Sequence, residues 1–373
     1  MFSSLRRLVP PLGRRWKPLD FTNPSFVRIP DYHKIEEETV PEYVASVYYP
    51  IRIGEVIRER YQVAGELGFG STSTVWLARD LRAHRHVMLK IFARTSFLGQ
   101  HVEHELEMYR HIEQSPKGHP GRDAIRTVLD TFDIDGPDDR HRCLVHPPLW
   151  ESTLTFLRRN PVERLPSAVL AMVLWRIFLM LDYLHTVCEI VHTDIKADNI
   201  MLGIDDDSVF SDFEEKELER PVPRKEVGPG LPVLCDFGSA MICKEYQTEY
   251  VQPKIYRAPE IWDIYEGGSL FTGQDPEFQR YRSHAHLAEM INLLGPPPST
   301  LLAKGTLEGK FFTDKGEFRA AHFLTDLTPL EGRETTLEGE EERDAFLRLM
   351  RKMLQWEPSK RSSASSLAED EWI

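Results

Sequence analysis

The sequence predicts an α+β fold in which a smaller, β-rich part precedes a larger and mainly helical part. Two observations support this prediction. Between residues 61 and 92, short runs of apolar and β-branched residues flank a turn that contains glycine. After residue 153, apolar residues recur with the spacing of helices. With 373 residues, of which 41% are hydrophobic, the chain can bury the core of one large domain or two small ones.

Local patterns place the individual elements. We expect strands at residues 61–63, 75–78, 86–92 and 143–145, and helices at residues 101–112, 153–159, 167–186, 281–294 and 343–355. The first helix has Val102, Leu106 and Tyr109 on one face. The most apolar window, within the helix at 167–186, is interrupted by Arg176 and Asp182. We therefore interpret it as a buried helix of the domain and expect no contact with a membrane.

Composition limits the partners. Acidic residues number 59 and basic residues 46, which gives a formal net charge of −13. Nucleic acids need a basic surface, so we expect no direct nucleic-acid binding, although an acidic balance can also serve solubility alone. The four cysteines lie far apart, which argues against a disulfide framework or a structural zinc site. A reducing compartment fits, and we expect the cytoplasm and nucleus.

Residues 1–60 are expected to form a proline-rich N-terminal extension, and its first residues are basic. No acid precedes Asp20, a composition typical of a mitochondrial presequence. Because Pro10 and Pro11 interrupt any amphipathic helix there, we favour a flexible basic extension and keep a mitochondrial location as the alternative. A second polar segment, at about residues 203–232, has the acidic composition of a disordered surface insertion.

The turn Gly68-Phe69-Gly70 is the first candidate site. Two glycines let the backbone approach a polyphosphate closely, and the turn joins two strands rather than a strand and a helix. This context excludes the dinucleotide-binding fingerprint and fits a hairpin that covers phosphates. Glycine turns are common, so this motif alone is a weak signal.

Lys90 stands alone within an apolar strand, and the following helix offers Glu103, Glu105 and Glu107 as partners. A buried ammonium group is costly unless it is paired. In one interpretation, Glu105 holds Lys90, which grips the α- and β-phosphates of a nucleotide. In the other, Lys90 belongs to an edge strand and extends its ammonium group to solvent.

A polar octet from His192 to Asn199 places Asp194, Lys196 and Asn199 on one short loop after the long buried helix. Phosphoryl transfer uses this set: a carboxylate orients the attacking hydroxyl, a cation meets the transferring phosphate, and an amide oxygen binds Mg²⁺. Asp236, at the end of a short apolar run, is the natural second Mg²⁺ ligand.

Together with Tyr256-Arg-Ala-Pro-Glu260 and Arg361, these motifs follow the order of the protein-kinase signature set, and the chain resembles the protein kinases from about Tyr61 onward. The resemblance implies a two-lobed protein-kinase-like fold that binds ATP in its cleft. The small β-rich N-lobe would span residues 61–145, and the hinge with the larger, mainly helical C-lobe would span residues 146–373. The resemblance also implies a structural salt bridge between Glu260 and Arg361.

The resemblance assigns a role to each site residue. Asp194 is the catalytic base, Lys196 is the cation that meets the transferring phosphate, and Asn199 and Asp236 bind Mg²⁺. Residues assigned to nucleotide binding are Leu67, Gly68, Gly70, Val75, the Lys90–Glu105 ion pair, and the hinge residues Pro147 and Leu149. In the hinge, the Pro147 carbonyl and the Leu149 N–H would bind adenine.

Thr193 in place of the usual arginine, the insertion before Asp236, and the stretch LFTGQDPE resemble the serine/arginine-rich (SR) protein kinases, particularly the fungal type. This resemblance implies a monomer that phosphorylates serines in Arg-Ser-rich proteins and so serves mRNA processing. Because the arginine that grasps a phosphorylated activation loop is missing, we expect activity to be independent of phosphorylation there. The acids Asp275, Glu277 and Glu289 could line an acidic groove or be ordinary surface residues.

The chain departs from the family pattern in two places. Ser73 stands where the third glycine of the phosphate loop is usual. After Glu260, the central helix that opens Asp-x-Trp-x-x-Gly is missing. Either the sequence omits a coding segment, or the protein is truly shortened and is a catalytically impaired pseudokinase scaffold that binds arginine-rich partners. A small-molecule phosphotransferase is a third option, against which the Ala258-Pro259-Glu260 segment argues.

Overall fold

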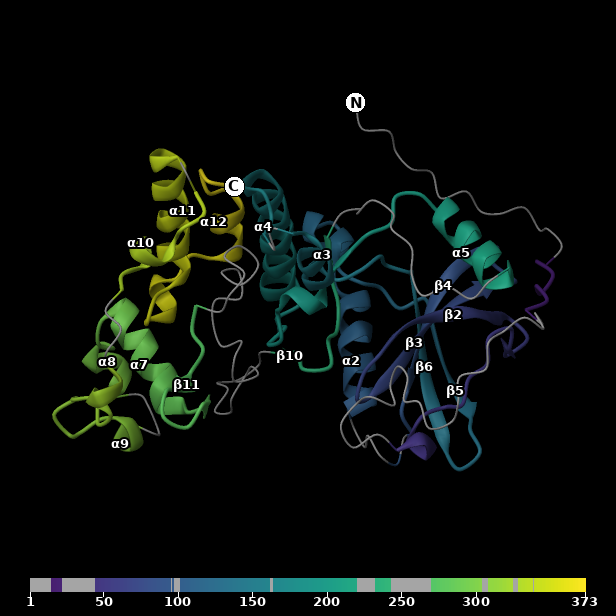
Figure 1. Cartoon of the computed structure of the whole chain (residues 1–373), viewed down its shortest axis with the longest axis horizontal. Coiled ribbons are helices and arrows are strands. Elements are labelled where there is room, and N and C mark those ends of the chain that lie inside the picture. The colour runs from purple at the N-terminus through teal and green to yellow at the C-terminus, as the bar shows by residue number, and fades with distance from the viewer. Residues whose placement is uncertain are drawn as a thin grey trace. The chain divides into compact units, whose positions relative to one another are not determined.

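The computed structural model describes residues 15–21, 44–94, 96, 101–161, 164–219, 232–242, 270–303, 308–324, 328–337 and 339–373. The chain divides into two compact units, whose elements are labelled in Figure 1. The first unit comprises Met1–Tyr109, Arg126–Trp150 and Gly203–Gly230, and the second comprises Arg110–Ile125, Glu151–Leu202 and Leu231–Ile373. The predicted order, with a β-rich part before a helical part, is confirmed.

The first unit is built on an antiparallel sheet with the strand order β1-β2-β3-β4-β6-β5. Its strands are β1 (Val56–Ile57), β2 (Tyr61–Phe69), β3 (Ser73–Asp80), β4 (Arg85–Phe92), β5 (Asp130–Asp135) and β6 (Arg140–His146). A 3-10 turn, η2 (Ala45–Val47), precedes them. The register of β2 against β3 shifts between Val63 and Gly65 and again between Glu66 and Gly68, just before the glycine turn. Such irregularities add local twist to the hairpin.

Apolar side chains from all six strands form the main core of this unit, including Ile57, Val63, Leu89, Phe132 and Val145. Helix α2 (His101–Gln114) also belongs to it through His101–Tyr109. The strands at 56–57 and 130–135 were not predicted. The first is too short for a periodic signal, and the second, DTFDID, contains three aspartates, a residue type that is depleted in strands.

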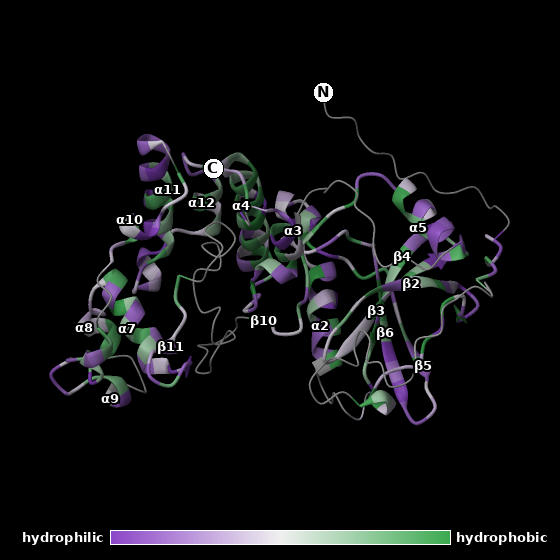
Figure 2. Ribbon diagram, in the orientation of Figure 1, coloured by the Kyte–Doolittle hydropathy of each residue, from purple (hydrophilic) through white to green (hydrophobic). Residues whose placement is uncertain are grey.

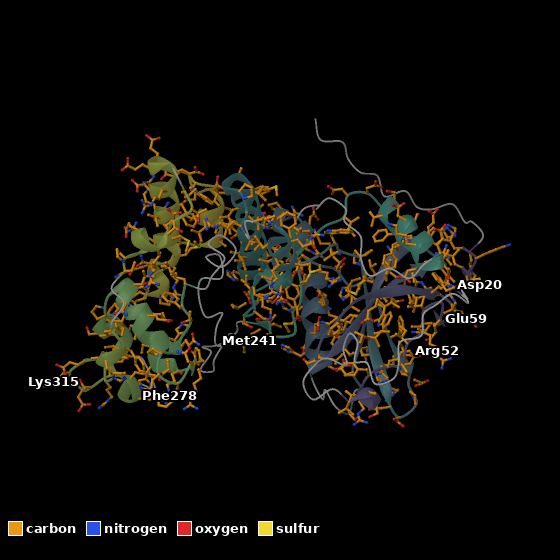
Figure 3. The ribbon with its side chains drawn as sticks, viewed as in Figure 1. Asp20, Arg52, Glu59, Met241, Phe278 and Lys315 are labelled. Carbon is orange, nitrogen blue, oxygen red and sulfur yellow. The ribbon has the colours of Figure 1, made fainter. Side chains whose placement is uncertain are left out.

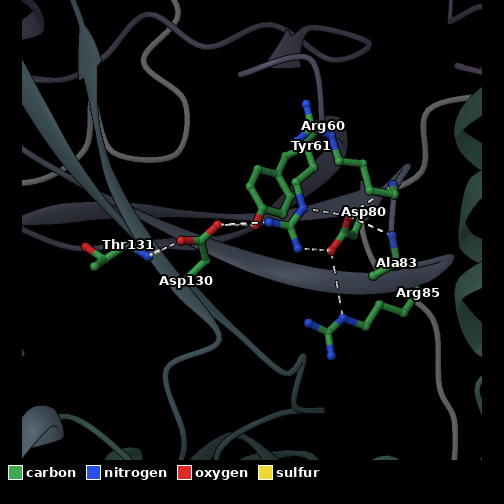
Figure 4. Close-up of polar contacts among 8 residues, drawn as sticks. Arg60, Tyr61, Asp80, Ala83, Arg85, Asp130 and Thr131 are labelled. Carbon is green, nitrogen blue, oxygen red and sulfur yellow. Dashed lines mark hydrogen bonds and ion pairs between the residues drawn. The ribbon is translucent and has the colours of Figure 1, made fainter. Parts of the chain in front are cut away.

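An ion network fixes one end of the sheet (Figure 4). The Arg60 guanidinium donates to both carboxylate oxygens of Asp80, at 2.9 and 2.8 Å, and to Asp130 at 3.1 Å. Burial opposes ionisation of the fully buried Asp80, but Arg60 and the backbone N–H of Ala83 outweigh it and lower the pKa of this carboxyl. The Tyr61 hydroxyl completes the network by donating to Asp130 at 2.7 Å.

The described part of the polar insertion is a helix, α5 (Ser208–Glu219), which lies over the sheet of the first unit (Figure 1). Val209 and Phe210 are buried against Ala64 and Leu77. The expectation of a disordered segment is therefore wrong for these residues. Its acids mask an amphipathic pattern, and composition ignores periodicity.

The second unit is mainly helical. Its helices are α3 (Thr153–Arg159), α4 (Ser167–Asp182), α7 (Ser283–Leu294), α8 (Ser299–Leu302), α9 (Glu308–Phe311), α10 (Leu330–Arg333), α11 (Glu340–Met353) and α12 (Ala364–Ala368). Short 3-10 helices are η3 (Pro120–Ala124), η5 (Ala197–Asn199), η6 (Ala321–Phe323) and η7 (Pro358–Lys360), and η4 (Tyr183–Val187) is a short π-helix. Two-stranded pairs join β7 (Ile190–Val191) to β10 (Met241–Ile242), β8 (Ile200–Leu202) to β9 (Pro232–Leu234), and β11 (Gln274–Asp275) to β12 (Arg280–Tyr281).

Helix α4 is hydrophobic along most of its length (Figure 2). Ser167–Val187 is long and apolar enough to cross a membrane by length and composition alone. However, α4 packs against α12 and η3, and its buried residues include Leu170, Leu174 and Phe178. These contacts favour the predicted core helix. One face, with Met172 and Trp175, is more exposed than that prediction implies.

Candidate active site

The glycine turn leaves open space where a phosphate chain could lie. A Cβ atom added to Gly68 would meet no atom within 4 Å, and one added to Gly70 would meet only the Ser73 carbonyl at 4.0 Å. Packing among the described residues therefore does not require glycine at either position. Close approach by a ligand is one physical reason for two glycines here, and the open space suits the phosphates of a nucleoside triphosphate.

Lys90 is held by Glu105. Its ammonium nitrogen lies 2.9 Å from each carboxylate oxygen of Glu105, and the two side chains are 15% and 4% exposed. Of the three candidate acids on α2, Glu105 is buried, whereas Glu103 is bound to Arg142 and Glu107 is exposed. Lys90 lies on an interior strand of the sheet, so the edge-strand interpretation is wrong.

Sheet register aligns the predicted nucleotide residues of the first unit. Val75 is the cross-strand partner of Gly68 on one side and of Lys90 on the other. Cross-strand partners project to the same face of a sheet, so Val75 and Lys90 share the face that Glu105 covers. Leu67 is half-buried in the strand that leads into the glycine turn.

The predicted hinge residues follow β6 directly. Pro147 and Leu149 are half-buried and lie in a segment that is neither helix nor strand. No other described residue accepts a hydrogen bond from the Leu149 N–H. A free donor at this place is what recognition of an adenine edge requires.

In the second unit, the loop from His192 to Asn199 contacts only one of the two carboxylate oxygens of Asp194. One oxygen, Oδ2, accepts hydrogen bonds from Lys196 Nζ and Asn199 Nδ2, each at 2.9 Å. The other oxygen, Oδ1, is buried and has no hydrogen-bond partner among the described residues. An unpartnered carboxylate oxygen costs free energy, so it marks a place where a ligand hydroxyl or water completes the site.

His192 fixes the backbone of this loop. Its Nε2 donates to the Cys235 carbonyl at 3.0 Å, so Nδ1 is the acceptor for the Asp194 N–H at 3.3 Å. Burial lowers the pKa of His192, which keeps the ring in the neutral form that this arrangement needs. Its ring also packs edge-on against Phe237, with centroids 4.9 Å apart.

Asn199 and Asp236 lie on neighbouring chain segments. The Cys235 N–H donates to the Asn199 carbonyl at 2.9 Å, and Ile200 pairs with Leu234 in the β8–β9 ladder. Both side-chain hydrogens used by Asn199 Nδ2 point to Asp194, which leaves the amide oxygen available for a cation. No group of three or more His, Cys, Asp or Glu in the described residues could hold a metal alone. Two oxygen ligands completed by nucleotide phosphates fit Mg²⁺.

Several expectations about charged residues are not confirmed by the structure. Glu260 lies outside the described residues, so its salt bridge with Arg361 stays a prediction; Arg361 Nε donates to the Gln355 carbonyl. Asp275 is wrong as a groove acid, because it is 1% exposed and binds Arg282 and the backbone of its own turn. Glu289 likewise accepts hydrogen bonds from Thr272 and Gly273.

The surface around β11 and β12 is not uniformly acidic. Phe278, labelled in Figure 3, is 49% exposed and lies under the guanidinium groups of Arg280 and Arg282, at 5.4 and 4.3 Å. Glu277 remains exposed beside it. Two arginines here weaken the case for an arginine-binding groove at this position.

Sequence reasoning missed Tyr48. Its hydroxyl lies 3.2 Å from the Gly70 carbonyl and 3.1 Å from the Ser71 carbonyl, and the side chain is buried. Tyr48 thus ties the glycine turn to the chain that precedes the sheet. Its position in the proline-rich extension carries no local signal of this role.

Residues 61–373 match the family described as protein kinase domain. A serine/threonine protein kinase of Aspergillus fumigatus is 35% identical over 377 residues, which cover 91% of this chain and 91% of that protein. The serine/threonine-protein kinase SRPK of Physarum polycephalum is 28% identical over 402 residues and 92% of each chain. SRSF protein kinase 3 of Mus musculus is 33% identical over 46% of this chain and 30% of that protein.

The fold agrees with these relatives. A crystal structure of a kinase domain superposes with a TM-score of 0.68 at 20% identity, covering 87% of this chain and 98% of that one. The likeness confirms the expected kinase fold, with a β-sheet N-lobe and a helical C-lobe. The chain belongs to the protein kinase family and is a protein serine/threonine kinase, for which ATP is the phosphoryl donor.

Proposed function

We propose that this chain is catalytically competent and transfers the γ-phosphoryl group of ATP to serines in Arg-Ser-rich proteins. The observation that carries the proposal is the asymmetry of the Asp194 carboxylate. Lys196 and Asn199 fix one oxygen, and the other is buried without a described partner. A scaffold without turnover has no need of a carboxylate poised in this way.

The nucleotide would be bound by residues of the first unit. The Pro147 carbonyl and Leu149 N–H suit the adenine edge, Leu67 and Val75 suit its faces, and the glycine turn suits the phosphates. Lys90, oriented by Glu105, places one positive charge for the α- and β-phosphates.

Asn199 and Asp236 of the second unit would hold Mg²⁺, which neutralises charge on the phosphates when it is bound. In the transfer step, the serine hydroxyl gives its proton to Asp194 Oδ1. Its oxygen forms a bond to the γ-phosphorus as the bond from that phosphorus to the β–γ bridging oxygen breaks. Lys196 stabilises the negative charge of the group in transfer, and ADP leaves.

Relatives and charge support the substrate class. Two relatives carry SR-protein-kinase names, SRPK and SRSF protein kinase 3, and this chain has a net charge of −13, which favours cationic substrates. The β11–β12 surface adds no support, because of Arg280 and Arg282. A monomeric state and a cytoplasmic and nuclear location stay predictions, and the mitochondrial alternative has no support beyond N-terminal composition.

A phosphotransfer assay on the full chain tests the proposal, with radiolabelled ATP, Mg²⁺ and an Arg-Ser repeat peptide. Asp194→Asn should lower turnover by at least about 100-fold because it removes the proton acceptor. Asp198→Asn is the matched control, since Asp198 is exposed on the same turn. A lysine-serine peptide of equal charge separates arginine recognition from charge alone.

After Glu260 the sequence lacks the Asp-x-Trp-x-x-Gly segment that the family pattern leads us to expect, in a region outside the described residues. This departure favours the pseudokinase scaffold as a second candidate. A thermal-shift measurement with Mg²⁺–ATP separates the two functions. Stabilisation by Mg²⁺–ATP without any transfer to the peptide would reject the proposed catalysis and support the scaffold. Equal turnover by wild type and Asp194→Asn would instead show that Asp194 lacks the assigned role.

A further inference from the structure

Part of the basic N-terminal extension is bound to the sheet of the first unit. We call residues 15–21 the N-terminal strap. The Trp16 N–H donates to the Leu81 carbonyl at 2.9 Å. The Gln62 side-chain amide, 1% exposed, donates to the Leu19 carbonyl at 2.7 Å and accepts from the Leu19 N–H at 2.8 Å. These hydrogen bonds hold the strap backbone in one register against the sheet, as the bonds of a paired strand do.

Side chains of the strap anchor it further. The Trp16 ring stacks on His84, with centroids 5.5 Å apart and an angle of 5° between the planes. Phe21 is 6% exposed, and its Cβ would lie 3.3 Å from a Cβ added to Gly54. Asp20 between these anchors, labelled in Figure 3, is exposed. The alternation of packed and exposed side chains is that of a docked peptide rather than a free tail.

Arg79 on β3 joins the strap to α5. Its guanidinium lies 4.8 Å from the Trp16 ring centroid and donates to the Lys17 carbonyl at 3.0 Å. The same guanidinium pairs with Glu214 of α5 at 2.9 Å, and His86 contacts that carboxylate at 2.6 Å. Arg79 is 8% exposed, and a buried charge is costly when a partner is removed. Loss of the strap would therefore weaken the attachment of α5.

The strap and α5 also share one small core. Phe21 packs in the same cluster as Ala64 and Leu77 of the sheet and Val209 and Phe210 of α5. This cluster is separate from the main core of the sheet. Because β2 and β3 supply its sheet residues, it braces the hairpin whose turn carries Gly68 and Gly70.

We propose that the N-terminal strap is an intramolecular docking peptide that holds α5 on the sheet and stiffens the β2–β3 hairpin, so that ATP affinity depends on it. The dependence on ATP rests on the proposed nucleotide site, whereas the docking does not. Among the described residues, the strap contacts come from Trp16, Lys17, Leu19 and Phe21. Cleavage after Phe21 would remove part of the folded core.

Hydrogen exchange in the full chain tests the docking. In the double variant Trp16→Ala/Phe21→Ala, amides of residues 208–219 should exchange at least about tenfold faster, because the core that orders α5 is opened. Lys17→Ala is the matched control: its side chain is exposed and Arg79 binds only its carbonyl. Unchanged exchange in the double variant would overturn the proposal.

Protection of strands β4 and β6, read in the same experiment, reports whether the variant folds. If the double variant unfolds, Trp16→Ala alone provides the test, since Trp16 is only half-buried. A synthetic peptide spanning residues 12–24, added to the variant, should restore the protection of α5, and a scrambled peptide should not. Failure of the native-sequence peptide to bind or protect would contradict docking.

Titration with Mg²⁺–ATP tests the coupling. The double variant should bind ATP at least about fivefold more weakly than wild type, and the native peptide should reverse this loss. Faster exchange in α5 with unchanged ATP affinity would reject the coupling while the docking stands. If the wild type itself binds no ATP, the proposed function is wrong. The hydrogen-exchange data still test the docking, because they do not depend on ATP.

Discussion

Thr193 shows how a single residue of the catalytic loop departs from the family pattern and what replaces the lost contact. Its backbone has φ 66°, a left-handed conformation that is unusual for a β-branched residue. Such strain costs on the order of 1–3 kcal/mol and needs support from its surroundings. The Thr193 hydroxyl supplies part of it by donating to the Ser239 carbonyl at 2.5 Å. This bond ties the catalytic loop to the segment after Asp236 without any phosphate.

This contact supports the expectation that activity is independent of phosphorylation after Asp236. Phosphatase treatment of the purified chain should leave turnover of an Arg-Ser peptide unchanged. Thr193→Val, which keeps the shape but loses the hydroxyl, should lower kcat by about fivefold, the factor that one hydrogen bond provides. Thr193→Ser keeps the hydroxyl and serves as control. A phosphatase-treated chain without activity would contradict the expectation.

Tyr48 gives a second prediction at this scale. Tyr48→Phe removes the hydroxyl that bonds the carbonyls of the glycine turn, so the KM for ATP should rise about fivefold with little change in kcat. Tyr49→Phe is the control, because the Tyr49 hydroxyl bonds Glu55 instead, away from the turn. Steady-state kinetics with varied ATP measure both. Equal KM values for wild type and Tyr48→Phe would show that the turn does not need this anchor.

At the scale of elements, close backbone contacts decide how the helices of the second unit pack. Gly121 in η3 lies directly against α4, and a Cβ added there would fall 1.9 Å from the Leu179 carbonyl oxygen. Around this contact, the Tyr183 hydroxyl donates to the Ile112 carbonyl, and His119 pairs with Asp182 at 3.0 Å. The backbone of η3 can approach α4 so closely only because no side chain intervenes.

Gly121→Ala should therefore destabilise the protein by about 3 kcal/mol, since backbone rather than a flexible side chain must move. Gly118→Ala is a matched control, because a Cβ at Gly118 would meet no atom within 4 Å. Thermal unfolding followed by circular dichroism compares the two variants. Equal Tm values would mean that η3 adjusts without cost and that this packing does not matter.

For the whole molecule, buried neutral histidines link stability to pH. Burial lowers the pKa of His192 and lowers that of His146 well below its usual value, to which the charge of Arg126 adds. His146 is fully buried, and its Nδ1 bonds the Thr127 carbonyl at 2.9 Å. Each ring is thus neutral in the folded state at pH values where the unfolded chain takes up a proton.

The sign follows from proton linkage. Well above pH 6.5 both rings are neutral in the folded and the unfolded state, so they do not change stability with pH. Below about pH 6.5 the unfolded state binds more protons at these rings, and stability falls. Each histidine should cost roughly 1 kcal/mol per pH unit in this range. The Tm should therefore fall between pH 7 and pH 5.5, and less steeply in His146→Phe. Exposed His322→Gln is the control, and an equal slope in His146→Phe would refute the linkage at His146.

Some elements of the fold could be predicted from the sequence, and others could not. Helices α3 and α4 and strand β4 lie where local spacing predicts them, because their apolar residues repeat with the period of one element. Helix α5 was not predicted, since its four apolar residues are hidden among acids and only the sheet gives them a surface to cover. The same holds for the strap, whose Trp16 and Phe21 have no local pattern.

By itself, the sequence determined which residue types each motif brings together, because Asp194-x-Lys196 and Asp236-Phe237-Gly238 keep their members close along the chain. Tertiary structure confirmed the Lys90–Glu105 pair, which the resemblance implied. It alone decided that Asp275 is a buried turn residue and that Tyr48 reaches the glycine turn. The physical reason is the distance along the chain between the residues that make contact. Spacing along one element sets the direction of a side chain, whereas its partner comes from distant chain that only packing brings near.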